Sequence, residues 1–129
     1  VAEYLSQIHV AVLTSLSESQ PLVLLEAGAS GVPFVATNVG SCREIIEGRP
    51  DERPLLGHGG IVTGLVSPQE VADAVGALLA NHDRRRAAGK ALRSRVEQRY
   101  TSSAAAKAYH ALYAELLARP TRIAPVGEV

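Results

Sequence analysis

The sequence predicts an α/β fold in which a parallel sheet is flanked by helices, and three observations support this prediction. Residues 8–13 and 32–37 are short apolar runs, as expected for strands buried on both faces of a parallel sheet. Residues 21–29, which lie between them, have the features of a helix, so strand, helix and strand follow one another within about thirty residues. The length of 129 residues suits one domain, whose core must be aliphatic because only 4% of the residues are aromatic.

The composition excludes several classes of function. Lys and Arg together number 13, as do Asp and Glu, so the formal charge is zero and nothing favours nucleic acid or a membrane surface as a partner. Cys42 is the only cysteine, which excludes an internal disulfide and favours a reducing cytoplasm. No apolar run reaches the roughly 18–20 residues of a transmembrane helix. The first residues lack an initiator Met and a charged leader, so we expect the sequence to be part of a longer protein.

Each element of the first half has a local signal. Residues 1–6 are expected to be the end of a helix, and the polar residues 14–20 form the loop after the first strand. The helix of residues 21–29 begins with Pro21, which loses no needed hydrogen bond at the first helical position. Gly31 follows the end of this helix, where glycine is favoured, and the second strand comes next.

The second half is predicted to be mostly helical. Residues 49–57 form a polar loop, and residues 60–63 are expected to be a short third strand. Ser67 and Glu70 have the spacing of a capping box with a proline just inside it, so a helix is predicted over residues 68–80.

Two further helices are expected towards the end of the chain. Residues 83–99 are rich in Arg and Lys, including the run 84–86, and are predicted to form a solvated helix. Thr101 can cap a last helix, and residues 119–129, with two prolines and a glycine, are expected to be disordered. We expect self-association through residues 101–117, because this helix carries one apolar stripe. The stripe consists of Tyr109, Leu112, Tyr113, Leu116 and Leu117.

The topology indicates where a ligand would bind. In open α/β sheets, ligands bind beyond the carboxyl ends of the strands. The loops that follow the first two strands, residues 14–20 and 38–44, are therefore the candidate segments, and both are rich in small and polar residues.

Two glutamates stand in a pattern that favours a nucleotide sugar as the ligand. Seven residues separate Glu18 from Glu26, and the chain turns at residues 19–21, so both side chains can face one crevice at the start of the helix. The unpaired amides of Leu22 and Val23, together with the positive end of the helix dipole, suit a phosphate. Carboxylates beside them can accept hydrogen bonds from sugar hydroxyls.

The alternative is that both glutamates are merely solvated surface residues. Glu26 argues against this alternative, because it is the only charged residue between Gln20 and Asn38 and lies in a strongly apolar helix. Such a helix is expected to be mostly buried, and a buried charge is costly without a partner.

These segments resemble a known family. Residues 17–27, followed by 29–33 and 35–40, are similar to glycosyltransferase family 4, whose members are retaining enzymes of the GT-B architecture with two Rossmann-like domains. The resemblance extends over about residues 1–117 and implies that residues 1–118 are the C-terminal, nucleotide-sugar-binding domain, with part of a Rossmann-like sheet.

Within the family, the variant in residues 20–21, 26–29 and 40–44 is most similar to the glycosyltransferase of Pel exopolysaccharide biosynthesis. Ser19 stands where many members have Gly, which would restrict the backbone of this loop. The resemblance implies UDP-glucose as the donor and a cytoplasmic location, peripheral to the inner face of the membrane.

The resemblance also implies roles for individual residues. Glu18 would be catalytic and contact the donor sugar, helped by Ser19, Gln20 and Pro21. The amides of Leu22 and Val23 would hold the distal phosphate, and Glu26 would bind the ribose. No metal is needed in the family, because the helix dipole and upstream basic side chains stabilise the leaving diphosphate. Those basic residues, the base-binding strand and the acceptor domain are not in this sequence, so we expect the chain alone to be inactive.

Other interpretations were weighed against this one. A stand-alone nucleotide- or sugar-binding module without catalysis would use the same crevice. A dinucleotide-dependent oxidoreductase is disfavoured because no Gly-x-Gly-x-x-Gly follows a strand. Cys42 has no His on a plausible catalytic scaffold, and Arg43 is expected to pair with Glu44 or Glu47. His9 and His58 are expected to be structural or loop residues.

Overall fold

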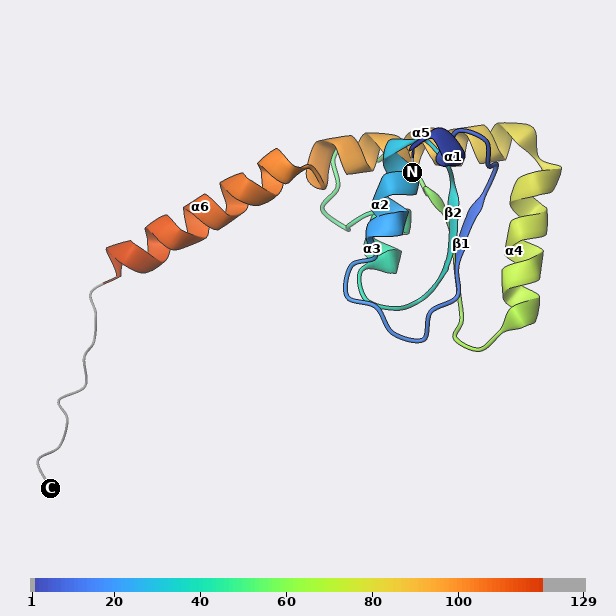
Figure 1. Ribbon diagram of the computed structural model, residues 1–129, viewed down its shortest axis with the longest axis horizontal. Helices are drawn as coiled ribbons and strands as arrows, with labels where there is room; N and C mark the ends of the chain where they lie inside the picture. Colours follow the sequence, from blue (N-terminus) through green and yellow to red (C-terminus); the bar gives the residue numbers. More distant parts are fainter. Residues whose placement is uncertain (1, 120–129) are drawn as a thin grey trace, which may run out of the picture.

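Figure 1 shows a computed structural model of the chain, which describes residues 2–119; the remainder of the tail, residues 120–129, lies outside this range. Within the described residues, strands β1 (Ala11–Leu13), β2 (Phe34–Thr37) and β3 (Gly60–Thr63) form a parallel sheet in the order β1-β2-β3. The predicted α/β fold is therefore confirmed.

Helices cover both faces of the sheet and one of its edges. Helices α2 and α3 lie on one face, α4 lies on the other, and α5 crosses the amino ends of the strands (Figure 1). The loops that follow the strands gather at the opposite edge, which leaves that edge open. The helices are α1 (Ala2–Leu5), α2 (Leu22–Ala29), α3 (Cys42–Glu47), α4 (Pro68–Ala80), α5 (His82–Arg99) and α6 (Ser102–Ala118).

Strand β2 is central, and all four of its residues are buried. Phe34 and Ala36 belong to an aliphatic cluster with α2 and α3, whereas Val35 packs with Ala74 and Leu78 of α4. Successive side chains of a strand point to opposite faces, so one apolar run supplies both halves of the core.

Strand β1 departs from the prediction. It begins at Ala11 rather than at residue 8, and Ile8 and Val12 are 43% and 45% exposed. The expected burial on both faces is therefore wrong for β1. It is an edge strand of the described sheet, and an apolar run does not indicate how many neighbouring strands a strand has.

The predicted helix at residues 68–80 is confirmed, but its capping box is not formed. Ser67 makes no side-chain cap bond. The Glu70 carboxylate instead accepts a hydrogen bond from the Gly64 amide at 2.7 Å, which ties the start of α4 to the end of β3. Helix α3 was not predicted, because it is only six residues long and follows a strand directly.

Helix α5 is not the solvated helix that its arginines suggest. Ala88, Leu92 and Val96 are buried on one side of it, and Arg95 is only 1% exposed. The Arg95 guanidinium donates to both oxygens of the buried Glu52 carboxylate, at 2.6 and 2.8 Å. It also donates to three carbonyl groups, those of Ile45, Ile46 and Gly57.

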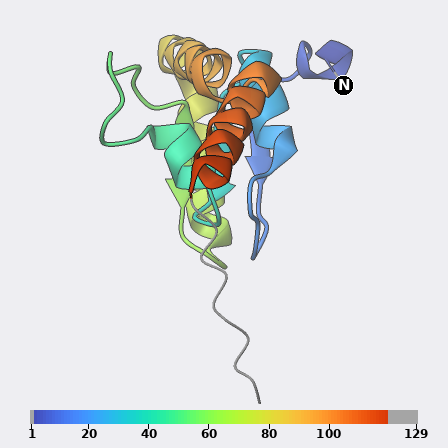
Figure 2. The ribbon, with the colours of Figure 1, turned by 90° about the vertical axis from the view of Figure 1, so that its left-hand side faces the viewer.

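This network of hydrogen bonds holds the loop between α3 and β3, which Figure 2 shows as a long loop that extends beside the helices. Glu52, in the middle of the loop, is 3% exposed, although most of its neighbours in the loop are exposed. One buried ion pair therefore attaches the loop to α5.

Helix α6 extends away from the rest of the chain, and none of its residues is buried (Figure 1). The predicted cap is confirmed, because the Thr101 hydroxyl accepts a hydrogen bond from the Ala104 amide at 3.2 Å. The apolar stripe is exposed, with Tyr109 and Leu112 at 62% and 48%. Among residues 2–119, no helix has the length and hydropathy needed to cross a membrane.

An exposed apolar stripe predicts concentration-dependent association. We expect sedimentation velocity to show a species larger than the monomer at high concentration, and Leu112→Glu to abolish it. Ala111→Glu introduces the same charge on the opposite side of α6 and should leave association intact. A monomer at every concentration, or equal effects of the two variants, would contradict this prediction.

Candidate functional site

The loops after β1 and β2 are joined at the carboxyl edge of the sheet. The Thr37 hydroxyl, at the end of β2, donates to the Ser15 carbonyl at 2.6 Å. The Ser41 amide donates to the Ser19 carbonyl at 2.9 Å. The Ser15 hydroxyl in turn donates to the Glu18 carboxylate at 2.7 Å. The structure thus brings together the two segments that the topology singled out.

Gly40 sets how closely these loops approach. Its φ is +49°, a backbone conformation that residues other than glycine rarely adopt. A Cβ atom placed there would lie 2.3 Å from the carbonyl oxygens of Glu18 and Ser19. Gly40 is therefore needed for the loop that carries Glu18 to rest on the end of β2.

Gly40→Ala is expected to displace the loop and to lower the free energy of unfolding by about 2–3 kcal/mol, since backbone strain and a steric clash combine. Gly57→Ala is a matched control, because Gly57 has a φ of +85° with no atom close enough to obstruct a Cβ. Its cost should be about 1 kcal/mol, from the backbone alone. Urea denaturation measures both; equal costs would show that the contact with the loop is unimportant.

The backbone conformation at position 19 does not require glycine. Among the described residues, Val66 is the only non-glycine residue with a positive φ. The backbone at Ser19 is therefore in a conformation open to any residue, so serine is accommodated there without strain.

The amino end of α2 is open to solvent. Pro21 is the N-cap, with extended φ and ψ of −72° and 117°, rather than the first helical residue that we predicted. No side chain caps the helix, and within residues 2–119 the Leu22 and Val23 amides have no acceptor. The side chains of these two residues are 70% and 44% exposed. An anion can therefore reach two free amides at the positive end of a helix.

The two glutamates lie in different surroundings. Glu18 is half-buried, and its carboxylate is held within its own loop by the hydrogen bond from the Ser15 hydroxyl. Glu26 is exposed, because α2 buries the side that carries Leu24 and Ala27. The expectation that Glu26 is a charge in a buried helix is therefore wrong. Within residues 2–119, its carboxylate makes no hydrogen bond or ion pair, so it is free to accept one.

Two other residues of the second loop have structural roles. Cys42 is fully buried, and burial raises the pKa of its thiol, which disfavours a nucleophile. Arg43 donates to Glu47 at 2.8 Å, which confirms the expected pairing, and to the Asn38 side chain at 3.2 Å.

Ser41 was not singled out from the sequence. Its hydroxyl oxygen is buried and has no hydrogen-bond partner within the described residues, although a buried polar atom is normally paired. It lies next to Gly40, where the two loops meet. The sequence signal is a Gly-Ser pair in the loop that follows a strand, and such pairs are common in turns.

A hollow of about 540 Å³ lies at the same edge, on the α4 face. Its lining is mostly apolar and comes from the ends of β1 and β2 and from the start of α4, including Leu16, Val66 and Val71. No local pattern predicted this hollow, because its lining residues come from separate segments of the chain. The carboxyl edge therefore combines free amides, a carboxylate and an apolar hollow.

Comparisons with known proteins identify the family of the chain. A sequence profile of the family described as "Glycosyl transferases group 1" matches residues 1–81. N-acetyl-alpha-D-glucosaminyl L-malate synthase of Bacillus anthracis is 32% identical over 117 residues, which are 91% of this chain and 29% of that protein. D-inositol 3-phosphate glycosyltransferase of Corynebacterium jeikeium is 35% identical over 107 residues, 83% of this chain and 23% of that protein. The chain thus spans less than a third of the length of these relatives.

Solved structures share the fold. Sucrose-phosphate synthase from Thermosynechococcus elongatus superposes with a TM-score of 0.75 and 30% identity, over 89% of this chain and 27% of that one. Anabaena HepE, solved in complex with UDP, superposes with a TM-score of 0.72 and 20% identity, over 87% of this chain and 29% of that one. Both comparisons assign the parallel sheet and its helices to the GT-B architecture.

Proposed function

The chain belongs to the group 1 glycosyltransferase family, and on this premise we propose that it is the nucleotide-sugar-binding part of a retaining glycosyltransferase. The observation that carries the proposal is the open amino end of α2, whose two free amides lie directly after the loop that carries Glu18. Anion-binding amides next to a hydroxyl-accepting carboxylate suit a sugar diphosphate.

Each group has a role in this proposal. The Leu22 and Val23 amides hold the distal phosphate, and the helix dipole stabilises the negative charge that develops on the leaving diphosphate. Glu18 contacts the donor sugar at the reacting centre, with Ser19, Gln20 and Pro21 shaping the loop. Glu26 binds the ribose hydroxyls. No residue in this set is a metal ligand in the proposal, and transfer by an enzyme that also contains the acceptor domain is expected to persist in the presence of EDTA.

UDP-glucose is the donor that we propose, with a role in exopolysaccharide biosynthesis at the cytoplasmic face of the membrane. The resemblance of residues 40–44 to the Pel enzyme supports this choice. That Anabaena HepE was solved with UDP supports testing uridine nucleotides first. Calorimetry against UDP-, GDP- and ADP-sugars identifies the donor, and a preference for another base would refute the choice of UDP.

One backbone substitution tests the anion site. Leu22→Pro removes the first free amide; proline is favoured at the first helical position, and the extended Pro21 before it tolerates a following proline. We expect UDP affinity to fall about tenfold or more, the loss of one charge-assisted hydrogen bond. Leu22→Ala, which keeps the amide, should bind as the parent does. Equal affinity of the two variants would refute the anion site.

A second candidate is a stand-alone nucleotide- or sugar-binding module without catalysis, which would use the same open amino end of α2. We propose that the 129-residue chain binds the donor but does not transfer the sugar, since transfer also needs an acceptor site. An assay of UDP release distinguishes the two steps: turnover by this chain alone would contradict the proposal, whereas donor binding without turnover supports it.

A further inference from the structure

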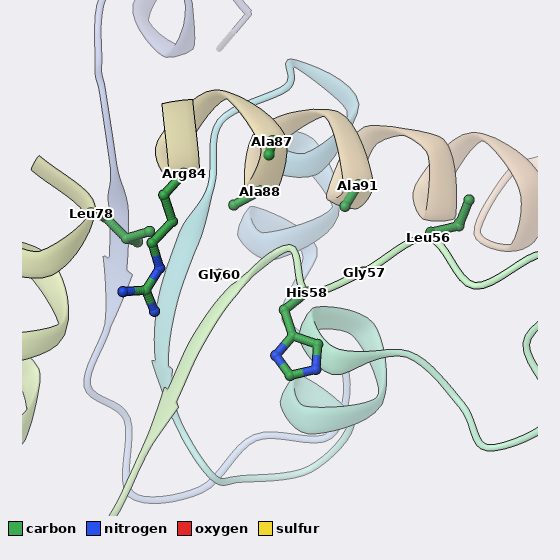
Figure 3. Close-up of a pocket in the computed structure, with 9 residues that line it drawn as sticks. All are labelled: Leu56, Gly57, His58, Gly60, Leu78, Arg84, Ala87, Ala88 and Ala91. Carbon is green, nitrogen blue, oxygen red and sulfur yellow. The ribbon is translucent and has the colours of Figure 1, made fainter. Parts of the chain in front are cut away.

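A second hollow, of about 260 Å³, lies at the amino ends of the strands, the edge opposite the candidate site. It is bounded by the end of α4, the first half of α5 and the segment that leads into β3 (Figure 3). The glycosyltransferase proposal makes no use of this region, so the two sites are independent.

Small residues create the hollow. Ala87, Ala88 and Ala91 of α5 line one side, and Gly60 lies at the start of β3. A Cβ atom on Gly60 would clash with the Phe34 backbone, so glycine is needed where β3 lies close to β2 beside the hollow. The space is smaller than the roughly 300–1,000 Å³ typical of drug-sized ligands, so it suits a small anion or one end of a metabolite.

The polar side chains that line the hollow are Arg84 and His58, and no acidic residue lines it. Figure 3 shows Arg84 reaching down from α5 and His58 projecting from the segment before β3. Within residues 2–119, the Arg84 guanidinium has no hydrogen-bond or ion-pair partner, and its amide is already capped by Asn81. Both side chains are exposed and free to meet a ligand.

Arg84 is also placed against the helix dipole. It lies in the first turn of α5, where the dipole disfavours a cation and favours an anion. The neighbouring Arg85 is compensated, because it donates to the Leu78 and Leu79 carbonyls at the end of α4. Arg84 has no such compensation in the described residues, and a bound anion would supply it.

We propose that this hollow binds a soluble small molecule through a phosphate group, held by Arg84 and His58. Phosphate suits the site because its oxygens point in several directions and can accept from donors on two separate segments. The arginine fork supplies paired N–H groups, and the imidazole supplies one more.

A titration of the chain with inorganic phosphate, followed by ¹H–¹⁵N NMR, tests the proposal. We expect saturable shifts at Gly57, His58 and Ala88, and at least about tenfold weaker binding in Arg84→Gln. Lys90→Gln removes the same charge from α5 at a residue that does not line the hollow, so it should leave the affinity unchanged.

A second variant tests the hollow itself. Ala87→Leu fills the space from an exposed position without altering charge, so it should keep the fold and lose phosphate binding. Shifts confined to Leu22 and Val23 would place the phosphate at the donor site alone and overturn the proposal, as would equal effects of the Arg84 and Lys90 variants. Binding to phosphatidic acid vesicles without binding to phosphate or glycerol 3-phosphate would also overturn it.

Discussion

Arg95→Met is expected to lower the free energy of unfolding by about 3–5 kcal/mol, because it leaves a buried carboxylate without its partner. The guanidinium supplies two bonds to Glu52 and three to backbone carbonyls, and 1% of Arg95 is exposed. The loss should therefore detach the loop around Glu52 from α5. Urea denaturation followed by circular dichroism measures the change.

Arg93→Met is the matched control. Arg93 lies on the same helix and pairs with Glu97 at 2.8 Å, but both side chains are more than half exposed. Solvent screens such a pair, so its loss should cost less than about 1 kcal/mol. Combining Arg95→Met with Glu52→Leu should recover part of the stability, because no buried charge remains while three carbonyls stay unpaired. Equal costs for the Arg93 and Arg95 variants would contradict this account.

The same pair predicts how stability changes with pH. The hydrogen bonds from Arg95 hold the pKa of Glu52 below its ordinary value. A carboxylate whose pKa is lowered by folding contributes stability above its unfolded pKa of about 4.3, and this contribution is lost as the pH falls through the folded pKa. The parent should therefore lose stability in acid. In Arg95→Met the carboxylate is buried without a cation, so the contribution of Glu52 to stability should change sign. Urea midpoints measured at about pH 3 to 7, a range that includes the unfolded pKa, would reveal this change.

Glu26→Ala is expected to weaken donor binding by about 1–3 kcal/mol, roughly 5- to 150-fold, if its carboxylate accepts hydrogen bonds from the ribose. Because Glu26 is exposed and unpaired in the described chain, the substitution should leave the unfolding midpoint unchanged. The effects of the substitution on donor affinity and on stability can therefore be measured separately. Calorimetry of the unsubstituted chain and of the variant with the UDP-sugar gives the two affinities.

Glu97→Gln provides the comparison for Glu26, since it removes an exposed helical carboxylate far along α5. It should leave donor affinity unaltered. Glu18 is a less direct test, because its carboxylate also accepts a bond from Ser15 and its backbone rests on Gly40. Unchanged affinity in Glu26→Ala would remove the ribose role from this residue.

Several elements could be predicted because their signals are local. The helix over residues 68–80 and the strand over 60–63 agree with α4 and β3, and the position of the site after β1 and β2 follows from the parallel order. The capping box is not formed, and the Glu70 carboxylate accepts a hydrogen bond from the Gly64 amide, just after β3, instead. The spacing of Ser67 and Glu70 is compatible with a capping box, but the folded structure determines which amide donates to Glu70.

Local patterns of hydrophobic residues, prolines and glycines were enough to predict the α/β class, the order of the main elements and the edge at which the loops meet, because these residues act over short stretches of chain. The exposure of Glu26, the partial exposure of β1 and the burial of Arg95 against Glu52 follow instead from contacts between distant segments. Arg95 and Glu52 lie 43 residues apart, so no local pattern reports their contact. Whether a residue is buried depends on the segments that pack against it. A buried arginine without partners would be costly, but Arg95 is stable in the core because it donates hydrogen bonds to five acceptors from other segments.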